Sequence, residues 1–221
     1  MKPNLRKFAL STHITLSVGW IGAVFAYLVL VAAAMTSQGA QTLRAAWIAM
    51  ELIGWYLIVP LALASLLSGL VMSLGTPWGL FRHYWVLISF MVTIVATVVL
   101  LQHMPTVSFF AGVAATTDSG DVSELRGALR GELLHAGVGV VLLLAIQVLN
   151  VYKPQGMTAY GRHKVSQVVL PTRSTDDASL KPSRGPASRT PRWVQVVGFH
   201  AIGLALLFVI FHLTSGGMGS H

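Results

Sequence analysis

The chain has 221 residues, of which 54% are hydrophobic and 10% are charged, whereas a soluble domain carries about 25% charged residues. This composition excludes an ordinary soluble protein and predicts an all-α integral membrane protein. The formal net charge is +8, but the basic residues lie beside apolar segments, so membrane orientation and lipid contact explain them better than nucleic acid. Cysteine is absent, which excludes disulfides, iron–sulfur clusters and haem attached through thiols.

The first two apolar segments predict transmembrane helices over about residues 8–35 and 45–74. The first contains His13 within its apolar run. The second contains Glu51, more than one helical turn inside the span, and Pro60 near its centre. Because proline lacks a backbone donor, we expect Pro60 to kink the second helix.

The third segment predicts a helix over about residues 83–104. Nineteen uncharged residues separate His83 from His103, which corresponds to roughly 30 Å of helix, or one hydrocarbon thickness. We therefore expect these two histidines near opposite membrane faces. Pro105 is expected to end or bend this helix, and residues 107–115 are expected to form a short interfacial helix.

The fourth span covers about residues 129–151, with Glu132 and His135 near its start, and it completes a four-helix core over residues 1–152. Residues 153–192 are basic and rich in proline, which is typical of a cytoplasmic loop. Residues 193–221 predict a fifth transmembrane helix and an outer tail. The positive flanking charges place the N-terminus in the cytoplasm and the C-terminus outside.

Polar residues of these spans fall at two predicted depths. The layer near the cytoplasmic face contains His13, His83 and His200. The layer near the outer face contains His103, His135, His212 and Glu51. Ionisable residues inside a membrane are costly, so both layers are candidate functional sites, although an interfacial anchor explains His83 better than a functional role does.

Paired histidines at equal depth on facing helices suit the two axial positions of haem b. The candidate pairs are His13 with His200, and His103 with His135. Alternatively, copper or another transition metal would be held by outer-layer ligands, namely His103, His135, His212 and Glu51.

The segment His13-Ile-Thr-Leu-Ser-Val-Gly-Trp20-Ile-Gly22 resembles the first helix of the CopD-like group of small bacterial membrane proteins. That group includes copper-resistance CopD domains and HemJ-type protoporphyrinogen oxidases. Gly-Trp-Tyr in the second span and Arg-His-Tyr-Trp before the third are similar to uncharacterised actinobacterial relatives of this group. The resemblance implies a four-helix core with one added helix, a haem- or copper-related role, and His13 as a candidate ligand. It does not extend to the oxidase activity.

The sequence therefore predicts a b-type haem protein of the bacterial plasma membrane that transfers electrons or acts as an oxidoreductase. Two alternatives stay open: copper transport or handling, and a membrane interaction protein without a cofactor. Membrane lipid is the expected partner and nucleic acid is excluded. The sequence does not identify the redox partner, for which a quinone is one candidate. A homodimer is compatible with the sequence.

Overall fold

The computed structural model describes residues 2–75, 83–116 and 122–152, together with the single positions 80, 196 and 203. The predicted loop 153–192 lies outside the described residues. So does the predicted fifth helix, apart from two single positions, and with it His200 and His212.

The described chain is helical, and its helices form four spans. The elements are α1 (Pro3–Thr36), α2 (Ala40–Ile53), the π-helical segment η1 (Gly54–Ile58), α3 (Val59–Gly75), α4 (Tyr84–Thr116) and α5 (Ser123–Tyr152). Because α2, η1 and α3 follow one another without a break, they make one span. All four spans are long and apolar enough to cross a membrane, which confirms the predicted multi-pass helical class.

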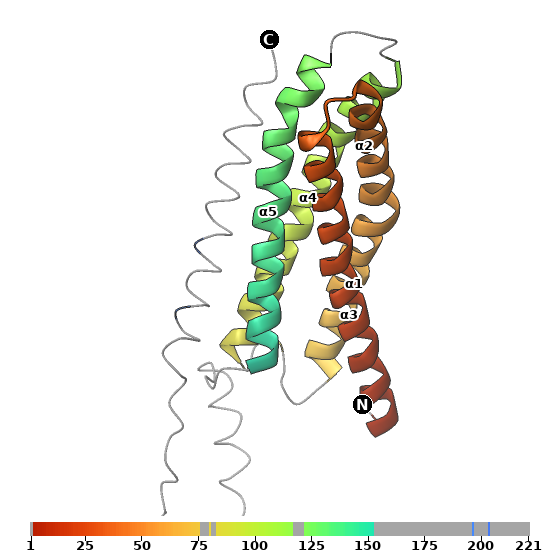
Figure 1. Ribbon diagram of the computed structural model, residues 1–221. Helices are drawn as coiled ribbons and strands as arrows, with labels where there is room; N and C mark the ends of the chain where they lie inside the picture. The colour runs from red at the N-terminus through yellow and green to blue at the C-terminus, as the bar shows by residue number, and fades with distance from the viewer. Residues whose placement is uncertain are drawn as a thin grey trace, which may run out of the picture.

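The four spans pack as an antiparallel bundle (Figure 1). The N-terminus and the end of α5 lie at one end of the bundle, and the turn between α1 and α2 lies at the other. α1 contacts α2, α3 and α5, while α4 contacts the same three helices from the opposite side. Large buried side chains fill the space between them, namely Val31, Leu43, Trp47, Met50, Met104, Leu125 and Leu129.

Helix α4 continues through Pro105 as far as Thr116. The expected end of this span at Pro105 is therefore wrong, and residues 107–115 belong to α4 rather than to a separate interfacial helix. Proline removes one backbone hydrogen bond, but Met104 and Val107 on either side of it are fully buried in the bundle. Packing against neighbouring helices holds the helix together at this position.

The sequence predicted a kink at Pro60, and the structure has a π-helical segment, η1, that ends two residues before this proline. The Val59 N–H donates to the carbonyl of Gly54, five residues earlier in the chain, which is the hydrogen-bond spacing of a π-helix. Gly54 also allows a close approach between helices, because a Cβ there would lie 2.5 Å from Cε of Met104. The second span thus changes its helical phase beside α4.

Candidate functional site

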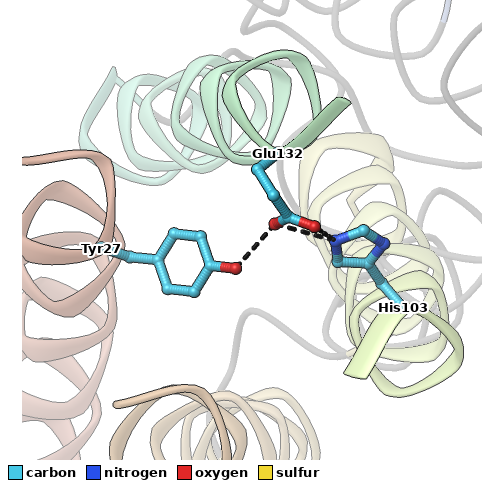
Figure 2. A network of polar contacts seen from close by, with 3 residues as sticks. All are labelled: Tyr27, His103 and Glu132. Carbon is cyan, nitrogen blue, oxygen red and sulfur yellow. Dashed lines mark hydrogen bonds and ion pairs between the residues drawn. The ribbon is translucent and has the colours of Figure 1, made fainter. Parts of the chain in front are cut away.

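A buried carboxylate joins three helices at the half of the bundle near the α1–α2 turn. Tyr27 of α1 donates a hydrogen bond of 2.6 Å from its hydroxyl to Oε2 of Glu132 on α5. Nε2 of His103 on α4 lies 3.0 Å from Oε1 and 3.1 Å from Oε2 of the same carboxylate. Figure 2 shows the tyrosine and the histidine approaching Glu132 from opposite sides. We call Tyr27, Glu132 and His103 the Glu132 network.

The helices place these three side chains well inside the bundle. Tyr27 and Glu132 each lie nine residues from the helix end at this side, Thr36 and Ser123, or about 14 Å. Glu132 is 2% exposed, and it is the only buried carboxylate among the described residues. Burial of an ionised carboxylate is costly unless hydrogen bonds and an opposite charge compensate it, and the Glu132 network supplies donors on both sides.

The ring of His135 stacks on the ring of His103. Their centroids are 3.6 Å apart and their planes differ by 12°. Both rings, together with Tyr27, line a small cavity of about 60 Å³ whose other walls are largely apolar. The predicted coincidence in depth of the two histidines is therefore present, as a direct contact between the rings.

A second polar group lies in the other half of the bundle, between α1 and α3. Nδ1 of His13 lies 2.9 Å from the Ser68 hydroxyl, which donates its own hydrogen to the carbonyl of Ser65 at 3.0 Å. When the Ser68 hydroxyl donates to the Ser65 carbonyl, it accepts from Nδ1 of His13. In that tautomer a neutral His13 carries its proton on Nδ1 and a lone pair on Nε2.

His13 lines a cleft of about 640 Å³ between α1, α3, α4 and α5, which we call the His13 cleft. Its walls are mostly apolar and include the aromatic rings of Trp20, Trp85 and Phe90. Ser89 also lines it, and the Ser89 hydroxyl is buried without a hydrogen-bond partner in the described part of the chain. Trp20 lines both this cleft and the small cavity beside His103, so the two spaces adjoin.

The predicted site residues are thus only partly brought together. His103 and His135 touch, whereas His13 lies in the opposite half. Glu51 lies three residues before Gly54, close to the depth of His103, but it is half-buried and takes no part in the Glu132 network. Within residues 2–75, 83–116 and 122–152, no three histidine or acidic side chains form a group that could hold a metal ion.

The two candidate haem sites differ in how well they would accommodate a haem. A porphyrin between His103 and His135 would have to pass between two rings in van der Waals contact, and Nε2 of His103 already faces Glu132. This pair does not fit as the axial ligands of one haem. The His13 cleft does fit: it offers a nitrogen lone pair, apolar walls and an orphaned hydroxyl. Its volume also falls within the range of about 300–1,000 Å³ that is usual for cofactor sites.

Sequence reasoning missed Tyr27 and gave Glu132 no role. A signal for Glu132 does exist, because it precedes His135 by three residues, and this spacing puts both side chains on one helix face. Tyr27 carries no comparable signal. It lies seven residues after Trp20 on the same face of α1, where an aromatic residue is typical of ordinary packing.

Comparison of the chain with protein-family models, with curated proteins and with solved structures finds no match.

Proposed function

We propose that this chain is a multi-pass protein of the bacterial plasma membrane that binds haem b in the His13 cleft and takes part in electron transfer. The observation that carries the proposal is the position of His13, which lines the cleft and whose Nδ1 lies 2.9 Å from the Ser68 hydroxyl, a contact that leaves Nε2 as the ring nitrogen for the iron. Histidines that ligate metals usually donate the other ring N–H to a fixed acceptor in this way, which orients the ring and raises its basicity.

The surroundings of His13 also favour haem as the molecule that occupies the His13 cleft. Gly69 faces the imidazole so closely that a Cβ there would lie 3.2 Å from Cε1 of His13, so the absence of a side chain makes room for the ring. Apolar and aromatic walls suit a porphyrin face, and Arg6 lines the cleft near the N-terminus, where a guanidinium would pair with propionate carboxylates. The resemblance of the His13–Gly22 segment to CopD-like proteins favours the same residue as a ligand.

The residues of the chain would hold and insulate the cofactor. His13 would bind the iron through Nε2, Ser68 would keep the ring in one tautomer, and Arg6 would neutralise a propionate. Bound haem would supply a one-electron couple, whose potential depends on the axial ligands and on burial. Trp20 lines both the His13 cleft and the small cavity beside His103, so its ring lies where the two spaces adjoin.

The proposed orientation places the His13 cleft towards the cytoplasm and the Glu132 network towards the outside. Lys2, Arg6 and Lys7 lie at the N-terminal end of α1, and a basic end is retained on the cytoplasmic side. Four spans between residues 3 and 152 return the chain to that side, where the basic segment 153–192 follows. A fifth span would then put the C-terminus outside.

The test compares the visible spectrum and haem content of the purified wild-type protein with those of His13→Ala. We expect His13→Ala to lose most of its bound haem, and added imidazole to restore the Soret band by filling the vacated ligand position. His83→Ala is the matched control, since His83 does not line the cleft, and it should keep the wild-type spectrum.

An unchanged spectrum and haem content in His13→Ala would contradict the proposal. If His13→Ala does not fold, His13→Met answers the same question, because methionine fills a similar volume but is a different axial ligand. The Soret band of His13→Met must shift if His13 ligates the iron, and an unshifted band would contradict the proposal equally.

A further inference from the structure

We propose that the Glu132 network is a proton-binding site inside the membrane, with one exchangeable proton shared between Nε2 of His103 and the carboxylate of Glu132. Proton exchange at this site is a separate property from haem binding. It does not depend on what occupies the His13 cleft, which lies on the other side of Trp20.

The charge of the network depends on how many protons it holds. With an ionised Glu132 and a neutral His103, the buried group carries one negative charge. One added proton makes it neutral, either as imidazolium with carboxylate or as imidazole with carboxylic acid. A low dielectric strongly favours a group without net charge, so the site gains from taking up that proton. Tyr27 keeps its own hydrogen throughout and donates it to Oε2.

The geometry allows the proton to change its position without movement of the backbone. Nε2 of His103 lies 3.0 Å from Oε1 of Glu132, which is hydrogen-bond distance. In the transfer the N–H bond at Nε2 breaks and an O–H bond forms at Oε1. The imidazolium becomes neutral imidazole and the carboxylate becomes a carboxylic acid, so no charge is created and no electron moves.

The groups around Glu132 are few. α1 contributes Tyr27 and α4 contributes His103, while α5 itself contributes His135 through its stack on His103. The ionisable residues of α2 are Arg44 and Glu51, both half-buried, and neither hydrogen-bonds Glu132. On α5, Arg126 donates to the carbonyl of Ser37 at the helix end, and Arg130 is exposed. Among residues 2–75, 83–116 and 122–152, the hydrogen-bond partners of Glu132 are Tyr27 and His103, and neither an arginine nor a lysine hydrogen-bonds it.

His103 and His135 line the small cavity beside the Glu132 network. The His103 side chain is 14% exposed, whereas that of Glu132 is 3% exposed. Two stacked imidazoles at 3.6 Å cannot both be protonated at low cost, because like charges at this distance repel. Nε2 of His103 is the atom through which this pair contacts Glu132.

Infrared difference spectroscopy of the purified full-length protein during stepwise changes of buffer pH tests the proposal, with the proton as the probe. We expect a band of a protonated, hydrogen-bonded carboxyl group to appear as the pH falls. The band should move to lower frequency in D₂O, since its hydrogen exchanges. It should be lost in Glu132→Gln and retained in Glu51→Gln, the matched control on α2.

Tyr27→Phe provides a second readout that a purely structural role would not change. Loss of the phenol donor should move the Glu132 carboxyl band to higher frequency, and this variant serves if Glu132→Gln does not fold. The proposal is overturned if the wild-type protein shows neither this band nor an imidazolium band at any pH at which it is folded. It is equally overturned if the band persists in Glu132→Gln or does not shift in Tyr27→Phe.

Discussion

At the scale of single residues, the contact between Gly69 and His13 offers the sharpest prediction. A Cβ at position 69 would lie 3.2 Å from Cε1 of His13, so Gly69→Ala must displace the imidazole by a few tenths of an ångström. The ring has room to move because it lines the His13 cleft. We expect a folded protein with a shifted Soret band and weaker haem retention, measured by absorption spectroscopy and by haem transfer to apomyoglobin.

Gly22→Ala is the control for that variant. A Cβ at Gly22 meets nothing within 4 Å, and both glycines lie in helix interiors, where alanine stabilises the helix by about 0.5–1 kcal/mol. Both variants therefore share the gain in helix propensity, and only Gly69→Ala touches His13. Equal haem retention in the two variants would show that the position of the His13 ring is unimportant.

At the scale of elements, the crossing of η1 and α4 depends on a glycine. Gly54 contacts Met104, and a Cβ there would lie 2.5 Å from Cε and 2.8 Å from Sδ of that side chain. Met104 is 1% exposed, so its thioether end can withdraw only into the small cavity that it lines. Overpacking of this kind costs about 1–3 kcal/mol, so Gly54→Ala should lower the free energy of unfolding by about that amount.

The measurement is a titration with denaturing detergent in mixed micelles, followed by circular dichroism. Gly112→Ala in α4 is the control, because a Cβ at Gly112 meets nothing within 4 Å. We expect Gly112→Ala to be neutral or slightly stabilising. If Gly54→Ala is as stable as Gly112→Ala, the helices are not held together by the close approach at Gly54.

The same elements show where sequence reasoning succeeds and where it ends. The apolar runs predicted all four spans, because hydrocarbon thickness requires about twenty apolar residues whatever their neighbours are. They did not predict that α4 continues through Pro105, because burial of Met104 and Val107 against other helices decides that point. Tertiary packing is invisible in the local pattern of a single helix.

The same distinction between local sequence pattern and tertiary packing applies to the candidate site. Depth along each helix is readable from sequence, so the meeting of His103 and His135 could be anticipated. Rotation about the helix axis is harder to read, and it is what turns Tyr27 and Glu132 inward. Glu51 has the right depth and a carboxylate, yet it does not join the Glu132 network.

At the scale of the whole molecule, the proposed orientation predicts which end of the bundle faces the cytoplasm. The chain has no cysteine, so Asn4→Cys and Gly39→Cys each provide a single labelling position, both at exposed residues. A membrane-impermeant maleimide should label Gly39→Cys in intact spheroplasts, because the proposed orientation puts the α1–α2 turn outside. It should label Asn4→Cys only after lysis. The reverse pattern would place the N-terminus outside. The His13 cleft would then lie towards the outside and the Glu132 network towards the cytoplasm.

The most direct test of the proposed function is the dithionite-reduced minus oxidised absorption spectrum of the wild-type protein purified from membranes. A haem b held by His13 predicts a coloured protein with a Soret band that shifts on reduction and with about one haem per chain. A colourless protein, purified from cells supplied with haem and lacking any Soret band after incubation with haemin, would contradict the assignment of the His13 cleft as a haem site.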